Sequence, residues 1–245
     1  NDILDGEAGN DQIYGGAGND IIDGDNGDDL IQAGLGDDSI YGGFGRDVIL
    51  AEEGNDVVTA AEGDDEVHGG AGNDTLFGND GNDLVNGGDG DDELVGGAGN
   101  DTLIGGAGLN RYYFDRAFGQ DVVQLEAGSQ DQIYLQDGIT ADEVVFSREG
   151  DDLLLAMDDG SQLRVAGYFV AGTAAWLQLG DASWISRAQM DAGFYYGGIG
   201  GGGSGADNLQ GTEGDDRLYG RGGDDTLDGL GGNDLIHGGD GNDTL

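Results

Sequence analysis

Aspartate residues recur in this sequence at a fixed interval of nine, and their carboxylates are the side chains best placed to do chemistry. One series runs without a gap from Asp2 to Asp101, and a second runs from Asp207 to Asp243. Carboxylate oxygens are ligands for hard cations such as Ca²⁺, so this spacing points to a row of metal sites. The candidate metal ligands are Asp2, Asp11, Asp20, Asp29, Asp38, Asp47, Asp56, Asp65, Asp74, Asp83, Asp92, Asp101, Asp207, Asp216, Asp225, Asp234 and Asp243.

Each aspartate sits in a nine-residue unit that also fixes a glycine and an apolar residue. Counting units from Gly6, the fourth residue is always glycine and the eighth is aliphatic until Tyr112 takes its place. A short fixed period of this kind indicates a solenoid. We predict a three-residue strand per unit, such as Ile21–Asp23, with the eighth residue facing a narrow core. The other six residues would form a tight turn, for which glycine supplies the positive φ angles.

Stacked turns would bring the carboxylates of successive layers close together. Neighbouring strands lie about 4.7–4.9 Å apart, and like charges at that separation cannot all stay ionised without compensation. Calcium accepts about six to eight oxygens, from carboxylates and from the backbone carbonyls that a glycine-rich turn exposes. The sequence therefore predicts multiple calcium ions as the cofactor.

The repeated stretches also resemble a known family. Gly15–Asp23, Gly69–Phe77 and Gly96–Ile104 follow the motif G-G-x-G-x-D-x-U-x, with U a large aliphatic residue, and on these residues the chain resembles the RTX nonapeptide-repeat proteins. The resemblance implies a right-handed parallel β-roll, in which two units form one turn and calcium lies between loops stacked on the same edge. The implied ligand pairs are eighteen residues apart, from Asp2–Asp20 to Asp83–Asp101 in the first block and from Asp207–Asp225 to Asp225–Asp243 in the second.

Four departures from the motif predict weaker sites. Ala51-Glu52 and Ala60-Ala61 replace the leading glycine pair in the loops that hold Asp56 and Asp65, and Arg46 occupies a fifth position. Asn110 stands where an aspartate is expected and supplies no charge.

The period divides the chain into three parts and predicts an all-β fold. Residues 1–113 form a first β-roll block and residues 203–245 a second, truncated block. Between them, residues 114–202 lose the period, and alternating stretches such as Asp121–Glu126 and Asp131–Gln136 predict a small, mostly antiparallel β segment that caps the roll. The stretch GITADEVVFSREGDDLLLAMDDGSQLRVAGYF resembles the haemolysin-type calcium-binding related domain that is often interleaved with RTX blocks.

One outward-facing row becomes apolar toward the end of the first block. Its last members are Phe77, Val95 and Tyr113, each eighteen residues from the next. Because exposed apolar area costs about 25 cal/mol per Å², we expect a cover over this row. The segment 114–202 folding back is the first candidate, and a partner chain is the second.

The composition excludes several classes of function. Asp and Glu number 51 against 8 Lys and Arg, so the net charge of −43 disfavours nucleic acid as a partner. No apolar run is long enough to span a membrane. Such acidic, glycine-rich composition would suit a disordered linker if its apolar residues were scattered, but here they are periodic. No catalytic motif is present, and His68 and His237 occupy outward-facing ninth positions, so we expect no enzyme activity.

These features predict a calcium-binding structural module of a larger secreted bacterial protein. The chain begins and ends inside a repeat, so we expect its partners to be calcium ions and the rest of the parent polypeptide, with cell-surface or self-association contacts as further possibilities. The resemblance implies export by type I secretion and an extracellular or cell-surface location. The module would be a scaffold of an adhesin or surface protein, or else an accessory folding and secretion domain of a toxin, hydrolase or epimerase.

Overall fold

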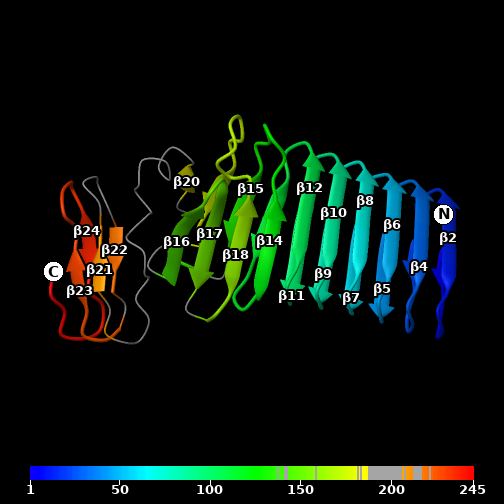
Figure 1. Ribbon diagram of the computed structural model, residues 1–245. Coiled ribbons are helices and arrows are strands. Elements are labelled where there is room, and N and C mark those ends of the chain that lie inside the picture. Colours follow the sequence, from blue (N-terminus) through cyan, green and yellow to red (C-terminus); the bar gives the residue numbers. More distant parts are fainter. Residues whose placement is uncertain are drawn as a thin grey trace.

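The described elements of the chain are all β-strands, arranged in two long sheets and two short ones. The computed structural model describes residues 1–136, 138–140, 143–157, 159–180, 182, 184–186, 206, 208–211, 217–220 and 222–245. Along the first 113 residues, successive strands alternate between the two long sheets, so that each turn of the solenoid contributes one strand to each (Figure 1). This is the parallel β-roll that the family resemblance implies.

The first sheet contains ten strands in a fixed order. It runs β1 (Ile3–Asp5), β3 (Ile21–Asp23), β5 (Ser39–Phe44), β7 (Val57–Glu62), β9 (Thr75–Asp80), β11 (Glu93–Ala98), β13 (Arg111–Phe114), β15 (Gln132–Leu135), β19 (Trp176–Gln178) and β20 (Trp184–Ser186).

The second sheet also contains ten strands and lies along the other side of the roll. It runs β2 (Gln12–Ala17), β4 (Leu30–Leu35), β6 (Val48–Glu53), β8 (Glu66–Ala71), β10 (Leu84–Asp89), β12 (Thr102–Ala107), β14 (Gln120–Gln124), β18 (Gln162–Ala166), β17 (Asp152–Met157) and β16 (Val144–Glu149).

The second repeat block pairs in the same parallel way over a shorter length. β21 (Asn208–Gln210) pairs with β23 (Thr226–Asp228), and β22 (Arg217–Tyr219) pairs with β24 (Leu235–His237). Leu209, Leu218 and Leu227 form a separate small core here.

The repeat register is eighteen residues, and it stacks one aliphatic side chain per unit. Val85 lies between Val67 and Leu103 in neighbouring strands, and all three are fully buried. The strands are longer than the predicted three residues, because from β4 to β12 each extends over six. The ladder pairing continues into the following unit, as Gly88 with Gly106 and Asp89 with Ala107. The first residue of that unit faces inward, and from β4 to β12 only glycine or alanine occupies the position, as at Gly87 and Ala60.

The segment after residue 113 continues both sheets. Its first two strands, β14 and β15, pair in parallel with β12 and β13, and β18 and β19 add in parallel to them in turn. Antiparallel pairing is confined, among the described strands, to β16–β17–β18 and β19–β20. The predicted antiparallel segment therefore begins about one solenoid turn later than the loss of period indicates.

The apolar outer row that ends the first block continues along the roll axis, because Tyr134 of β15 lies next to Tyr113 of β13. Phe77, Val95 and Tyr113 are each partly buried, and the ring of Tyr113 stacks on Tyr134 with the centroids 4.9 Å apart. The expectation that residues 114–202 fold back over this row is wrong for the strands described, since they lengthen the two sheets. Residues 187–205 lie outside the described part of the chain.

Candidate metal sites

The predicted aspartates line up in two rows, one along each edge of the roll. We call ladder 1 the row that precedes the strands of the first sheet, and ladder 2 the row that precedes those of the second. Ladder 1 contains Asp2, Asp20, Asp38, Asp56, Asp74 and Asp92, and ladder 2 contains Asp11, Asp29, Asp47, Asp65, Asp83 and Asp101. All members from Asp20 to Asp101 are buried.

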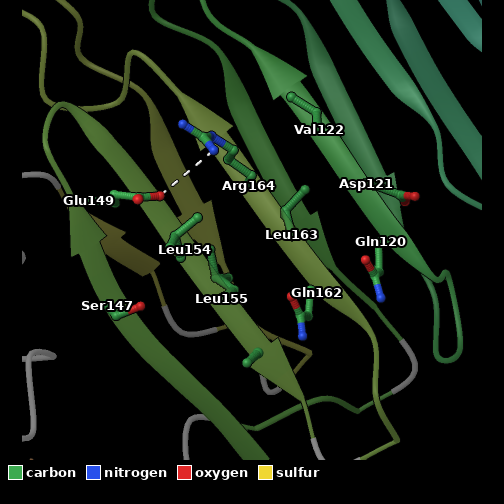
Figure 2. A pocket seen from close by; sticks show the side chains of 11 residues that line it. Gln120, Asp121, Val122, Ser147, Glu149, Leu154, Leu155, Gln162, Leu163 and Arg164 are labelled. Atoms are coloured by element: carbon green, nitrogen blue, oxygen red, sulfur yellow. Dashed lines mark ion pairs between the residues drawn. The ribbon is translucent and has the colours of Figure 1, made fainter. Parts of the chain in front are cut away.

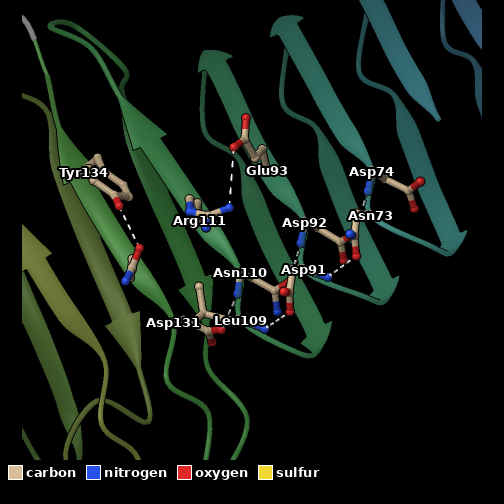
Figure 3. Close-up of polar contacts among 11 residues, drawn as sticks. Asn73, Asp74, Asp91, Asp92, Glu93, Leu109, Asn110, Arg111, Asp131 and Tyr134 are labelled. Carbon is tan, nitrogen blue, oxygen red and sulfur yellow. Dashed lines mark hydrogen bonds and ion pairs between the residues drawn. The ribbon is translucent and has the colours of Figure 1, made fainter. Parts of the chain in front are cut away.

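A hydrogen bond joins every consecutive pair in each ladder. The backbone N–H of Asp56 donates to Oδ1 of Asp74 at 2.9 Å, and the N–H of Asp74 donates to Oδ1 of Asp92 at the same distance (Figure 3). The ten pairs of the first block all show this contact, with N···O distances between 2.6 and 2.9 Å. Each carboxylate is thereby held in one orientation, with Oδ1 directed at the preceding layer.

The second oxygen of each carboxylate is buried and lacks a partner in the protein. Oδ2 accepts no hydrogen bond in any ladder member from Asp11 to Asp101. A polar atom left in this condition costs roughly 1–3 kcal/mol, and more if charged. The orphaned oxygens therefore require a ligand from outside the chain or a proton.

Backbone oxygen converges on the same space. A methyl group added at Gly42 would lie 2.7 Å from Oδ2 of Asp47 and 2.6 Å from the carbonyl oxygen of Ala60 in the next layer. Gly15 offers the same arrangement, 2.7 Å from Oδ2 of Asp20 and 2.5 Å from the Ala33 carbonyl oxygen. These spacings are close to the about 2.3–2.6 Å of calcium–oxygen bonds. In the described residues no three His, Cys, Asp or Glu side chains converge, so carbonyl oxygens would have to complete a coordination shell.

Without a cation the ladders are electrostatically costly. Burial, reinforced by neighbouring carboxylates, raises the pKa of Asp56 and of Asp83 to about 7, against the lowering effect of the backbone hydrogen bond. Burial likewise raises the pKa of Asp65 and of Asp101 to about 6. In the absence of a cation, burial thus disfavours the charged form of these carboxylates, and a bound cation would favour it again.

The fifth position of each unit forms a contrasting row on the exposed outer edge. There Asn55 donates to Asp37 through both its backbone N–H and its side-chain amide, at 2.9 and 3.1 Å. Asn82 does the same to Asp64, at 2.8 Å in each case. These hydrogen bonds lower the pKa of Asp37 and of Asp64. Asp37 and Asp64 are therefore satisfied by amides, whereas the buried sixth-position carboxylates keep an Oδ2 without a partner.

The departures from the motif change the space beside the carboxylate. Ala51 and Ala60, which replace glycine at the first position, are fully buried there, and Ala33 is a third alanine of the same kind. In these units the alanine methyl group occupies the space beside the carboxylate that a glycine leaves open for a ligand.

At Asn110 the room is filled by the protein itself. The Tyr112 hydroxyl accepts a hydrogen bond from the Gly105 N–H at 2.8 Å. A methyl at Gly105 would meet the same hydroxyl at 2.5 Å and also contact the Asn110 side-chain amide. Asn110 still accepts from the Asp92 N–H at 3.0 Å, so the ladder geometry persists without the charge.

The second block repeats the arrangement where it is described. The Asp225 N–H donates to Oδ1 of Asp243 at 3.0 Å, and a methyl at Gly220 would meet Oδ2 of Asp225 and the Gly238 carbonyl oxygen. Asp234 is partly buried at the corresponding position of its own loop. Asp207 and Asp216 lie outside the described residues, so the pairs Asp207–Asp225 and Asp216–Asp234 stay predictions.

The structure adds two aspartates that the nine-residue phase does not reach. Asp121 accepts from the Asp101 N–H at 2.9 Å and extends ladder 2, and Asp131 accepts from the Asn110 N–H at 3.0 Å and extends ladder 1. Both are buried. A sequence signal exists for each, because an aliphatic residue follows two positions later, as after the repeat aspartates: Val123 and Ile133.

Comparison with known proteins follows this geometry. The profile of the RTX calcium-binding nonapeptide repeat, which describes four copies at a time, matches residues 1–31, 23–58, 59–94, 86–116, 201–236 and 223–245. These matches cover more than half of the chain, which therefore belongs to the RTX nonapeptide-repeat family. Repeats of this family bind several calcium ions per domain, and their β-roll is a structural calcium-binding unit typical of secreted proteins.

Two individual proteins show partial similarity. The iron-regulated protein FrpA of Neisseria meningitidis serogroup C is 47% identical over 62 residues, a stretch that covers 24% of this chain and 6% of FrpA. The chain thus spans a small part of this relative's length. The extracellular lipase LipA of Serratia marcescens aligns over 65% of this chain and 36% of its own, with 24% identity and a TM-score of 0.30. Among the described residues no helix is long and apolar enough to cross a membrane.

Proposed function

We propose that this chain is a calcium-dependent scaffold within a larger secreted bacterial protein, and that it folds when it meets extracellular calcium. The observation that carries the proposal is the pair of ladders: buried carboxylates whose Oδ2 atoms lack partners and face backbone carbonyl oxygens of the next layer. The ladder aspartates, with these carbonyls, would hold the ions. When bound, calcium supplies the positive charge that lets stacked layers remain ionised and packed.

The energetics of a unit support an obligate role for the ion. One aliphatic side chain per nine residues contributes roughly 1.5–3 kcal/mol on full burial, whereas ordering each backbone residue costs about 1–2 kcal/mol. Ion binding to the folded state has to supply much of the difference. Extracellular calcium sites bind at about 10⁻⁴–10⁻³ M, a range that favours folding outside the cell after export in an unfolded state, as in type I secretion.

Circular dichroism of the intact chain tests the proposal. In chelator the β signal should be weak, and about 10 mM calcium should restore it, whereas the same concentration of magnesium should not, since magnesium demands a tighter octahedron. Asp74→Asn should shift the calcium titration, and Asp80→Asn, an exposed carboxylate in the next loop, should not. A chelated chain that keeps its β signal and its melting temperature would refute the calcium-dependent role.

The role of the scaffold depends on the parent protein to which it belongs, and the roll would suit two kinds of parent protein. We favour an extension region of an adhesin or surface protein, in which the roll bears no activity of its own. The alternative is an accessory folding and secretion domain of a toxin, hydrolase or epimerase. Sequencing the full reading frame distinguishes them, because tandem repeat modules support the first kind of parent protein and an adjoining catalytic domain supports the second.

A further inference from the structure

The two ladders end differently, and the difference lies beyond the nonapeptide repeats. In ladder 2 the last repeat aspartate, Asp101, is followed by Asp121, twenty residues later. The matches to the repeat profile stop at residue 116 and resume at 201, so Asp121 belongs to no recognised repeat. Its backbone nevertheless lies in register with the roll, because Thr102, Leu103 and Ile104 pair with Val122, Val123 and Gln124.

The loop before Asp121 reproduces the end of a repeat turn. Gly119 forms a parallel bridge with Gly99 and has a φ of 95°, in the left-handed region like the fourth-position glycines. The N–H of Gln120 donates to Oδ1 of Asn100 at 3.0 Å, which continues the amide row of the fifth position. Two extra residues are absorbed earlier in the loop, so Gly119, Gln120 and Asp121 occupy the fourth, fifth and sixth positions of a unit.

Asp121 itself has the features of a ladder member. It is 2% exposed, and its Oδ2 is buried and accepts no hydrogen bond. Oδ2 of Asp101, in the layer below, is in the same condition. In the following layer the register partner of Asp121 is Leu163, on β18, so no further carboxylate stacks on it (Figure 2). Asp121 is therefore the last carboxylate of ladder 2, and its Oδ2 and that of Asp101 are both buried without a partner in the protein.

Ladder 1 is closed by neutral groups instead. Between Asp92 and Asp131 stands Asn110, and the Tyr112 hydroxyl and the Asn110 amide occupy the space at Gly105. Asp131 accepts the backbone N–H of Asn110 at Oδ1, at 3.0 Å, so its neighbour in the ladder is an amide and not a second carboxylate. The step from Asn110 to Asp131 therefore has one carboxylate instead of two, and side chains of the protein fill the space at Gly105.

We propose that Asp101 and Asp121 hold a terminal calcium ion of ladder 2, at a site outside the repeat phase, and that ladder 1 holds no ion between Asn110 and Asp131. This inference rests on the proposed calcium-binding function. It makes the first layer of the non-repeat segment part of the calcium-dependent unit.

Asp121→Asn and Asp131→Asn form a matched pair for the test. Both replace a buried aspartate that accepts one N–H from the layer below, at 2.9 and 3.0 Å, and both keep Oδ1 as an acceptor. Crystals of the calcium-loaded chain, measured for anomalous scattering by calcium, should show a peak between Asp101 and Asp121 and none between Asn110 and Asp131. Asp121→Asn should lose that peak, and Asp131→Asn should keep every peak of the wild type.

Hydrogen exchange of the same proteins gives a second readout in solution. The peptide 117–124 should gain protection with calcium in the wild type and in Asp131→Asn, and should lose that calcium dependence in Asp121→Asn. Peaks between repeat aspartates with none at Asp101 and Asp121 would overturn this inference and leave the proposed function standing. A chain without any calcium peak would overturn the proposed function as well.

Discussion

Replacing Gly87 with alanine tests where an ion sits without removing any ligand. Gly87 lies in β10 outside the left-handed region, so an alanine there carries no backbone strain. Its methyl group would lie 2.7 Å from the Gly105 carbonyl oxygen and against Oδ2 of Asp92. The substitution therefore fills the space in which these two oxygens converge. The roll tolerates such a methyl elsewhere, since Ala33, Ala51 and Ala60 are buried at equivalent positions.

The expected size of the effect follows from binding linkage. At about 10 mM calcium, a site that binds at about 10⁻⁴–10⁻³ M stabilises the folded layer by roughly 1.4–2.7 kcal/mol. Loss of the ion should therefore raise local opening about 10- to 100-fold. Overpacking adds about 1–3 kcal/mol of its own, but that cost does not depend on the calcium concentration. The dependence on calcium is what separates the two causes.

Hydrogen exchange monitored by mass spectrometry is the suitable assay, because it reports each layer separately. In the wild type, protection of the peptide 84–98 should rise with calcium, whereas in Gly87→Ala this dependence should weaken. The peptide 21–35, several layers away, serves as the internal control, since each layer of a solenoid contacts only its neighbours.

Ala60→Gly is the reciprocal variant. It removes the methyl beside the loop of Asp65 and should steepen the calcium dependence of the peptide 57–71, after allowance for a glycine cost of about 0.5–1 kcal/mol. If both variants keep the wild-type calcium dependence in these peptides, the ions do not occupy the space at the first position, and the site geometry argued above is wrong.

Three further outcomes are expected. First, in chelator the folded roll should lose stability as the pH rises. Burial raises the pKa of Asp47 and of Asp92 to about 6 and that of Asp56 to about 7, whereas an unfolded aspartate has a pKa of about 3.9. The folded state is therefore most stable below about pH 3.9, and this stability is lost as the pH rises through about 6 to 7. Circular dichroism from about pH 5 upward, above the pI of 4.1, checks this, and a β signal that grows with pH in chelator contradicts it. Second, Asp74→Asn should raise the calcium concentration at half folding by about twofold or less. The substitution affects the two pairs that Asp74 forms, with Asp56 and Asp92, and a loss of roughly 1.4–2.7 kcal/mol per site is shared among many cooperating ions. A chain that no longer folds in calcium would contradict that sharing. Third, Leu103→Ala, at a fully buried position, should reduce the free energy of unfolding in saturating calcium by about 2.7–5 kcal/mol, and a change under about 1 kcal/mol in urea denaturation would show that the aliphatic stack is not the core.

Much of the first block could be predicted because each unit repeats one set of physical requirements. The aliphatic residue every ninth position predicts the inner stack, and Val67, Val85 and Leu103 indeed occupy it. The pairing of Asp56 with Asp74 followed once the eighteen-residue turn was inferred from the family resemblance, and the N–H to Oδ1 contact confirms the juxtaposition.

Strand length and the end of the roll could not be predicted from the repeat phase. Glycine at the first position has low intrinsic strand preference, and the extension to six residues results from pairing with the layers on either side. Asp121 was missed for a related reason. A strict count of nine fails after residue 113, whereas the backbone absorbs two extra residues in the loop and restores the register at the Gly99–Gly119 bridge.

Asn110 shows that stacking alone does not require aspartate at the sixth position. It accepts a hydrogen bond from Asp92 and donates one to Asp131, both at 3.0 Å, so an asparagine fits the ladder with its backbone contacts intact. The fifth-position row makes the same point, since Asn82 and Asp64 stack through amide–carboxylate hydrogen bonds that need no cation. A neutral ladder would therefore preserve the geometry and avoid the repulsion between buried charges. Because aspartate fills every ladder position before Asn110 instead, the buried carboxylates of the roll need counter-charge, and on the proposed function they would make folding conditional on calcium.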